Sequence, residues 1–242
     1  MAEGDIAGNP AWTEFVQTEE TYQETLLMMS SLGKAMVAFK LADCEVTNSI
    51  FLNTEELLEC NKELLRLVRV RGEGDVRQLA YAFSACSDEM QRVYKPYLQQ
   101  YKTAEAFLGI YLREERFMAL VNPFVETMEL MRKHREPVTA ATCMASPRRV
   151  VNVNLKCLLV APVQRICKYE LMLKEMLKRV NHDAELTMQL NAAYNCSKTL
   201  CNMIDGGLEV AAPLDTSAKK LLKKLERTTS KRGSVIDPDG LI

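Results

Sequence analysis

Long segments of this chain carry apolar residues at helical spacing, and nothing along it signals a β-hairpin. The clearest case is 155–180, whose apolar stripe runs through Leu155, Ile166 and Leu173. Glycine (10) and proline (8) are scarce and methionine (13) is common, a balance that favours helices over a turn-rich β fold. We therefore predict an all-α domain, and 242 residues suffice for one large domain with its own core.

Capping residues, prolines and glycines divide the chain into predicted helices. Disordered ends are expected at 1–10 and 229–242, with one helical domain at 11–228 between them. The first predicted helix is 11–43, opened by Pro10, and the second is capped by Asn53 or Thr54. A third starts at Asp75 and is kinked or ended by Pro96, and a fourth runs from Thr103 to about His134 with an interruption at Asn122–Pro123. The last three are about 150–180, 183 to about 205, closed by Gly206–Gly207, and a short helix after Pro213.

Composition argues against several classes of function. The formal net charge is −1, which gives no sign of a nucleic-acid-binding protein. The eight cysteines form no CxxC pair and the two histidines stand at no zinc-ligand spacing, so we expect free thiols in a reducing cytosol and no bound metal or cofactor. No run approaches the ~18 apolar residues of a membrane span, and residues 1–10 hold no signal core. A cytoplasmic protein is expected.

Motifs for covalent catalysis are missing from the sequence. It contains no GxxxxGK[ST], GxGxxG, HExxH or GxSxG motif. Neither His134 nor His182 stands in a motif, and a hydrolase triad needs a placed histidine. We therefore do not expect an enzyme that transfers protons or groups.

Glu19 is an anomaly on the first predicted helix, because it falls on the apolar stripe between Phe15 and Tyr22. A carboxylate there must reach an edge, pair with a buried cation, or lie where the stripe leaves the core to meet a partner. It is also possible that the stripe simply ends and Glu19 is solvated. Helix geometry alone leaves these alternatives open.

A second anomaly is the face of 155–180 opposite its apolar stripe. That face is too apolar for a solvated surface and too polar for a core, which suits a docking surface with a few specific polar groups. Another helix of the same domain could equally cover it. Pro162 should bend the helix at this point. The residues of the face are Cys157, Val160, Gln164, Cys167, Lys168 and Leu171.

The segment PVQRICKYELMLKEMLK (162–178) resembles the third signature region of Dbl-homology exchange factors, P-x-Q-R-x-x-K-Y-x-x-x-L-x-E-L. QTEETYQETL (17–26) resembles the first signature, T-E-x-x-Y-x-x-x-L, and 55–65 with 94–108 resembles the second. The likeness spans 11 to about 210, and the three motifs stand in the family's order. It implies a flattened, elongated helical bundle that accelerates GDP release from a Rho-family small GTPase by remodelling switch I and switch II and displacing Mg²⁺.

The same resemblance implies a role for individual residues. Glu19 matches the family's glutamate that contacts switch I, and Lys168 matches the lysine that contacts switch II. Asp205 stands where the family usually has an asparagine that also addresses switch II; an aspartate accepts the same hydrogen bonds but donates none. Val160 matches a position that helps to choose the GTPase. Gln164 and Leu171 complete the expected GTPase-binding set with these four.

A competing hypothesis is a helical scaffold or membrane-surface module without exchange activity. It draws on the predicted basic helix near the carboxyl end, where seven lysines and arginines face one acid, Glu226. Such a cluster can make a weak contact with anionic lipid and recruit the protein to a membrane. An ordinary solvated helix would have the same composition. The sequence does not identify the GTPase, flanking domains, autoinhibition or the oligomeric state.

Overall fold

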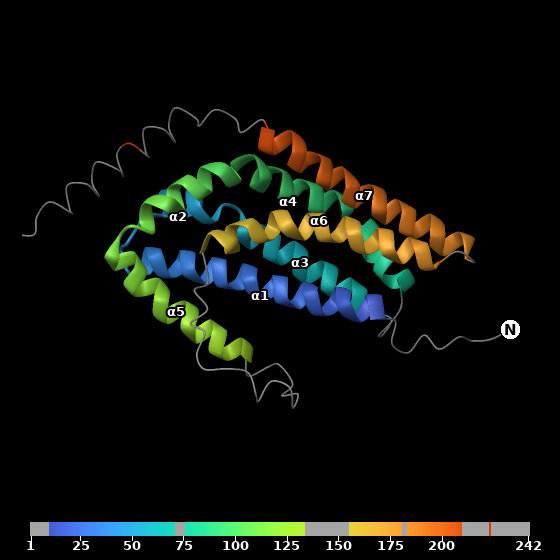
Figure 1. Ribbon diagram of the computed structural model, residues 1–242, viewed down its shortest axis with the longest axis horizontal. Helices are drawn as coiled ribbons and strands as arrows, with labels where there is room; N and C mark the ends of the chain where they lie inside the picture. The colour runs from blue at the N-terminus through green and yellow to red at the C-terminus, as the bar shows by residue number, and fades with distance from the viewer. Residues whose placement is uncertain (1–9, 71–75, 134–154, 181–182, 210–222, 224–242) are drawn as a thin grey trace, which may run out of the picture.

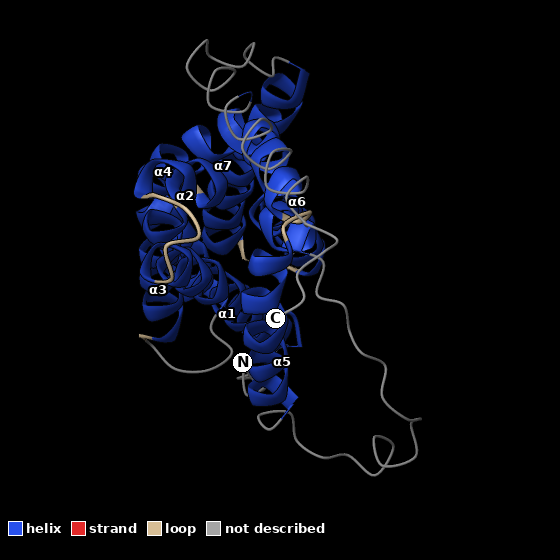
Figure 2. Cartoon of the chain, turned by 90° about the vertical axis from the view of Figure 1, so that its left-hand side faces the viewer, coloured by secondary structure: helices blue, strands red, loops and turns tan. Residues whose placement is uncertain are grey.

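The computed structural model describes residues 10–70, 76–133, 155–180, 183–209 and Lys223. Every regular element in these ranges is a helix, which confirms the predicted all-α fold (Figure 2). The helices are α1 (Pro10–Ala38), α2 (Cys44–Phe51), α3 (Thr54–Arg69), α4 (Val76–Tyr111), α5 (Glu115–Lys133), α6 (Leu155–Arg179) and α7 (Ala184–Glu209).

The long helices lie side by side in an elongated bundle (Figure 1). α4 packs against α2, α3, α6 and α7, while α1 packs against α3 and α6. α5 turns away from the end of α4 and contacts α1. This arrangement leaves α6 between α1 and α7, with one side toward the core and the other toward solvent.

The first predicted helix ends earlier than expected, at Ala38 rather than at residue 43. Lys40 adopts a positive φ of 55°, and bonds from Lys40 N to Val37 O and from Leu41 N to Met36 O close the helix in a Schellman motif. Asp43 then caps α2, because its carboxylate accepts a hydrogen bond of 2.8 Å from Val46 N. This reversal was not expected, because residues 39–43 contain no glycine or proline.

Pro96 was expected to kink or end its helix and Pro123 to interrupt another, but neither proline ends a helix. α4 continues through Pro96 to Tyr111 without reopening at Thr103, and α5 continues through Pro123. A proline removes one backbone donor, but buried neighbours such as Val93 and Tyr97 hold the helix on both sides of Pro96. The chain instead turns after Tyr111, where Glu114 N donates to Tyr111 O.

The remaining helix ends follow the sequence in part. Asn53 precedes α3 as predicted, with Glu55 and Glu56 in the first turn, but its amide donates to Val93 O at 2.8 Å and does not cap the helix. α7 passes the expected stop at Gly206–Gly207 and reaches Glu209. Glycine within a helix costs about 1 kcal/mol relative to alanine, which weakens a helix without forbidding it.

Some expectations fall outside the described residues. They concern the short helix predicted after Pro213 and the two ends predicted to be disordered. Within the basic segment only Lys223 is described, and it is helical and exposed. The predicted domain limit at 228 therefore stays a prediction.

Two helical glycines provide a matched test of packing. A Cβ at Gly109 would meet nothing within 4 Å, whereas one at Gly33 would lie 3.1 Å from the Phe51 ring. We expect Gly109→Ala to raise the free energy of unfolding by about 0.5–1 kcal/mol, because alanine loses less chain entropy on folding. Gly33→Ala should gain less than this or lose stability. Urea unfolding of both variants checks the difference, and an equal gain at both positions would contradict the packing described around Gly33.

Candidate functional site

α6 carries two faces with different surroundings. Its predicted apolar stripe is buried, with Ile166, Tyr169 and Leu173 at most 1% exposed. The opposite face, here called the α6 outer face, consists of Cys157, Val160, Gln164, Cys167, Lys168 and Leu171. Five of these side chains are exposed, Leu171 at 63%, and Val160 is half-buried against the core. No helix in the described part of the chain covers this face, so the alternative of an intramolecular cover is excluded there.

A buried ion pair lies behind the α6 outer face and joins α6 to α1. The Arg165 side chain of α6 is 3% exposed and the Glu19 side chain of α1 is 0% exposed. Arg165 donates from Nε to Glu19 Oε2 at 2.7 Å, and its Nη2 makes a second bond to the same oxygen. Its third contact is from Nη1 to Thr18 Oγ1 at 2.9 Å. All of the guanidinium nitrogens therefore have partners on α1.

The second carboxylate oxygen of Glu19 is also satisfied. Tyr169 donates its hydroxyl to Glu19 Oε1 at 2.6 Å, and the Asn61 amide of α3 donates to the same oxygen. The Arg165 guanidinium lies 4.8 Å from the centroid of the Tyr169 ring and 5.5 Å from that of Phe15, within cation–π range. Burial by itself would lower the pKa of Arg165, but Glu19 and Tyr169 raise it above its ordinary range. Arg165 is thus held charged.

Of the alternatives open for Glu19, the structure shows pairing with a buried cation. The Glu19 side chain has no exposed surface in this structure, and its expected contact with switch I stays a prediction. Arg165 and Asn61 were given no role from the sequence, and Tyr169 was expected only as part of the apolar stripe. Arg165 and Tyr169 belong to the matched third signature, and this match was the sequence signal that could have identified them.

Aromatic side chains fix the same helices around the ion pair. The Phe83 ring of α4 contacts Phe15 and Tyr169 with centroids 5.6 and 5.1 Å apart, both edge to face. The Tyr97 hydroxyl donates to Leu159 O of α6 at 2.7 Å, in the turn that precedes Pro162. A proline ring crowds the carbonyls of the preceding turn, so a hydroxyl from α4 stabilises the helix where its own ladder is weakest.

A further pair of buried hydroxyls links α1 to α4. Tyr22 and Tyr94 lie 3.0 Å apart between their hydroxyl oxygens. Burial, and then the neighbouring Tyr94 and Glu19, raise the pKa of Tyr22 well above its ordinary value. Burial also raises the pKa of Tyr94, and the charges of Tyr169 and Glu19 add to this effect. Burial raises the pKa of Tyr169 as well, with the charge of Glu19 adding to it. These tyrosines are neutral at physiological pH.

The remaining site predictions have different outcomes. Asp205 lies in α7, and its side chain is outside the described residues. The seven described cysteines are free thiols, of which Cys60 and Cys86 are buried and Cys44, Cys157 and Cys167 are exposed. Among the described residues no cluster of His, Cys, Asp or Glu could hold a metal ion, and no helix is long and apolar enough to cross a membrane.

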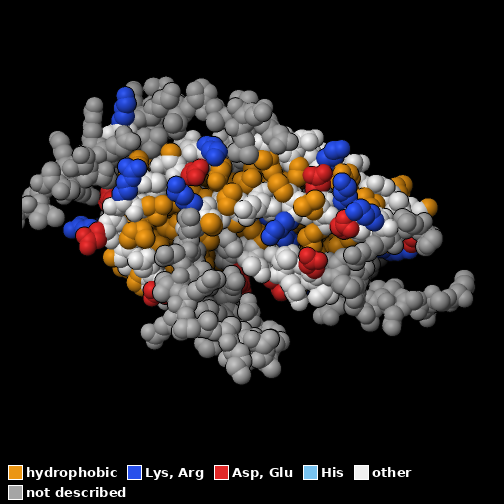
Figure 3. Space-filling view, viewed as in Figure 1, with side chains coloured by type: hydrophobic (Ala, Val, Ile, Leu, Met, Phe, Trp, Pro, Cys, Tyr) orange, Lys and Arg blue, Asp and Glu red, His pale blue; other side chains and the backbone are white. Residues whose placement is uncertain are grey.

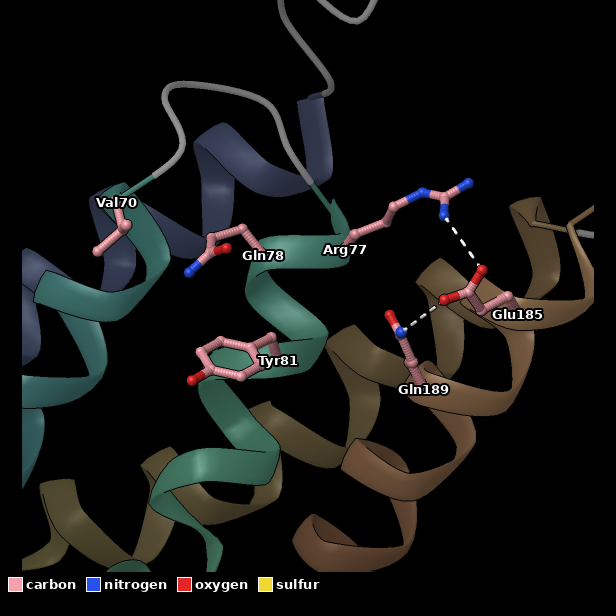
Figure 4. A pocket seen from close by; sticks show the side chains of 6 residues that line it. All are labelled: Val70, Arg77, Gln78, Tyr81, Glu185 and Gln189. Atoms are coloured by element: carbon pink, nitrogen blue, oxygen red, sulfur yellow. Dashed lines mark hydrogen bonds and ion pairs between the residues drawn. The ribbon is translucent and has the colours of Figure 1, made fainter.

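One hollow lies away from the α6 outer face (Figure 4). It measures about 450 Å³ and lies between the end of α3 and the first turns of α4 and α7. Arg77 projects there toward Glu185, with 3.9 Å between the closest charged atoms, and also pairs with Asp183. Acidic partners thus neutralise its cation, and nothing in the hollow points to a ligand. Its lining residues are Val70, Arg77, Gln78, Tyr81, Glu185 and Gln189.

The model of the RhoGEF domain family matches residues 11–205, most of the chain. The chain belongs to this family. The α6 outer face and the Glu19–Arg165 pair therefore lie within a RhoGEF domain.

Curated relatives of this RhoGEF domain carry names of exchange factors. The human phosphatidylinositol 3,4,5-trisphosphate-dependent Rac exchanger 2 protein is 27% identical over 225 residues, which cover 88% of this chain and 12% of that protein. Mouse guanine nucleotide exchange factor VAV3 is 25% identical over 193 residues, 79% of this chain and 20% of that protein. The chain therefore spans a small part of the length of these relatives.

Solved structures share the fold of this RhoGEF domain. The DH/PH domains of PDZ-RhoGEF, in complex with activated RhoA, superpose with a TM-score of 0.63 at 17% identity, over 87% of this chain and 56% of that one. Autoinhibited Vav1 superposes with a TM-score of 0.65 at 22% identity, over 99% of this chain and 38% of that one. The elongated helical bundle of the Dbl-homology type is thereby confirmed.

Removing one partner of the buried ion pair should destabilise this RhoGEF domain strongly. Arg165→Met leaves the Glu19 carboxylate buried without its cation, and we expect a loss of about 3–5 kcal/mol in the free energy of unfolding. The double variant Glu19→Leu/Arg165→Met removes both charges and should recover much of that loss. Denaturant unfolding of the two single variants and the double variant measures the coupling. Additive losses would show that the pair does not act as a unit.

Stability should fall at alkaline pH because of the buried tyrosines. Their pKa values are raised in the folded state, so their contribution is complete below the ordinary tyrosine pKa of about 10 and is lost as the pH rises above it. We expect the free energy of unfolding to decline above pH ~10, and Tyr22→Phe to make the decline shallower. Chemical denaturation across this range, with tyrosinate absorbance as the second readout, checks both. Ionisation of Tyr22 at its ordinary pKa in the folded protein would contradict the burial described.

Proposed function

We propose that this RhoGEF domain is a guanine nucleotide exchange factor for a small GTPase of the Rho family and that the α6 outer face is its docking surface. The single observation that carries the proposal is that the face predicted from the third signature is exposed in the folded chain, with Lys168 and Gln164 among apolar neighbours. A surface that mixes apolar area with a few polar groups is typical of protein interfaces. The names of the relatives, which include both Rac and Rho, support a Rho-family GTPase as the partner.

The proposed mechanism uses binding alone and no covalent chemistry. A GTPase holds GDP through its phosphate loop, Mg²⁺ and ordered switch segments. A factor that binds the nucleotide-free state more tightly than the loaded state must weaken nucleotide affinity by the same factor. Lys168 is proposed to bond switch II and so favour loss of Mg²⁺, and Asp205 is proposed to accept hydrogen bonds from the same segment. GTP then refills the site and displaces the factor.

The other site residues have supporting roles in the proposal. Val160 is stiff and half-buried, so it presents a fixed shape that discriminates among GTPases by the bulk of the facing residue. Gln164 and Leu171 extend the contact on either side of Lys168. Glu19 acts from behind this surface, because it holds Arg165 and Tyr169, which lie next to Gln164 and Lys168 along α6.

The test is release of fluorescent GDP from a panel of Rho-family GTPases in excess GTP. Lys168 is exposed, so Lys168→Ala should change the free energy of unfolding by no more than about 0.5 kcal/mol. Loss of charge-assisted bonds to switch II should cost the nucleotide-free complex about 1.5–3 kcal/mol, which lowers exchange roughly tenfold to a hundredfold.

The matched control is Lys174→Ala, which removes an exposed lysine from the same helix about a third of a turn around its axis. It should leave exchange unchanged. Equal rates for Lys168→Ala and the unmutated domain would remove Lys168 from the mechanism. If the unmutated domain releases GDP from no member of the panel, the chain is a binding module without exchange activity.

A further inference from the structure

A pair of cysteine thiols meets where α6 packs against α7. The two helices follow one another in the chain and lie side by side in opposite directions (Figure 1). Near the turn between them, Thr187 Oγ1 donates to Val180 O at 2.9 Å, and further along the Tyr194 hydroxyl donates to Glu170 Oε1 at 3.4 Å. This alignment brings the later turns of α7 beside the middle of α6.

Cys201 of α7 lies beside the turn of α6 that contains Cys167. Its Sγ is 3.6 Å from Ile166 O, the carbonyl oxygen just before Cys167 in the chain. Its thiol is also close enough to the Cys167 thiol and the Glu170 carboxylate to form hydrogen bonds with them. Cys167 and Glu170 are three residues apart and so lie on the same side of α6. A second thiol and a carboxylate therefore lie within reach of Cys167.

The two thiols differ in their access to solvent. Cys167 is exposed on the α6 outer face, directly before Lys168, whereas Cys201 is half-buried. On the side of the molecule shown in Figure 3, hydrophobic side chains, the class that includes cysteine, are exposed over α6 and α7 between isolated charged ones. A small oxidant in solution therefore reaches Cys167 first.

We propose that Cys167 and Cys201 are an oxidation site, where hydrogen peroxide forms a reversible disulfide that links α6 to α7 and lowers nucleotide exchange at the adjoining face. The Cys167 thiolate attacks one peroxide oxygen, the O–O bond breaks, and the departing hydroxide takes up a proton to become water. Cys167 is then a sulfenic acid.

The second step closes the disulfide. The Cys201 sulfur attacks the sulfenic sulfur of Cys167, so the S–S bond forms and the S–O bond breaks. The Glu170 carboxylate accepts the proton of Cys201 and passes it to the departing hydroxide, which leaves as a second water. In total two thiols lose two electrons and two protons, and one hydrogen peroxide is reduced to two waters.

Burial and charge set the order of these steps. Burial raises the pKa of Cys201, and Glu170 and Cys167 add to this effect, so Cys201 stays protonated until Cys167 has reacted. Cys60 and Cys86 also lie near each other, but both are buried. Burial raises the pKa of Cys60 to about 12 and that of Cys86 to about 11, so neither is often a thiolate. We therefore expect peroxide to spare this core pair.

The effect on exchange rests on the proposed function of the α6 outer face. A disulfide bond is about 2.05 Å long, shorter than a non-bonded contact between two sulfur atoms, so its formation must move the turn of α6 that carries Lys168. We expect exchange to fall roughly tenfold, the size of effect that follows if Lys168 loses a charge-assisted bond. Reduction should restore the rate.

Peptide mapping of the whole chain after peroxide treatment tests the oxidation site. Trypsin cleaves after Arg165 and Lys168, on both sides of Cys167, and after Lys198, between Cys196 and Cys201, so the linked peptide identifies the pair. We expect a peptide that joins residues 166–168 to residues 199–219, in a protein that stays monomeric on a non-reducing gel. A disulfide that forms only between other cysteines, or none, would overturn the proposal.

Variants test the order of the two steps. In Cys201→Ser the sulfenic acid of Cys167 has no thiol to attack it, so dimedone should label Cys167, whereas in Cys167→Ser dimedone should leave Cys201 unlabelled. Cys157→Ser is the matched control, because it removes an exposed thiol of the same face and should leave the yield of the disulfide unchanged. Dimedone labelling of Cys201 in Cys167→Ser would contradict the order proposed.

The exchange assay tests the consequence, with peroxide removed before the GTPase is added. Cys201→Ser should have the exchange rate of the reduced, unmutated domain and should keep it after peroxide, and thermal melts verify that it is folded. An unchanged rate in a domain that carries the mapped disulfide, or an equal loss in Cys201→Ser, would overturn control of exchange by the disulfide. If the reduced domain has no exchange activity, the proposed function fails, while peptide mapping still decides whether the oxidation site exists.

Discussion

The buried ion pair between Glu19 and Arg165 is the interaction on which the arrangement of this domain depends. Two charges removed from water cost several kcal/mol each, and their mutual attraction repays this only when the remaining hydrogen-bonding capacity is satisfied. Here Thr18, Tyr169 and Asn61 supply those partners from α1, α6 and α3. The ion pair therefore fixes the axial alignment of these three helices, because a shift along any of them would leave a charged group without its hydrogen-bond partners.

The registry has a functional meaning because Arg165 and Tyr169 lie next to Gln164 and Lys168 along α6. Inward side chains that are fixed in position also fix the neighbours that face outward. The aromatic contacts of Phe83 and the bond from Tyr97 to Leu159 O add constraints from α4 on the same stretch of helix. A preorganised surface loses less conformational entropy when it binds, so more of its contact energy is available to distort a partner.

The sequence predicted the parts of the structure that depend on local periodicity. The inward stripe of α6 and its outer face follow from helical spacing, and burial bears out both. Spacing could not decide between the alternatives for Glu19, because its partner Arg165 is distant in the chain and only the tertiary fold brings them together. The helices through Pro96 and Pro123 were missed because packing outweighs the loss of one backbone hydrogen bond. The end of α1 at Ala38 was missed because Lys40, just after it, adopts a backbone conformation that glycine usually supplies.

The two exposed thiols of the α6 outer face make it accessible to covalent chemistry. Cys157 and Cys167 are open to solvent, whereas burial raises the pKa of Cys60 to about 12 and that of Cys86 to about 11, so these two are rarely thiolates. The thiolate is the nucleophile toward electrophilic compounds, so the raised pKa values of Cys60 and Cys86 protect these two core thiols in addition to their burial. An acrylamide or chloroacetamide fragment of suitable shape could thus be anchored beside Lys168.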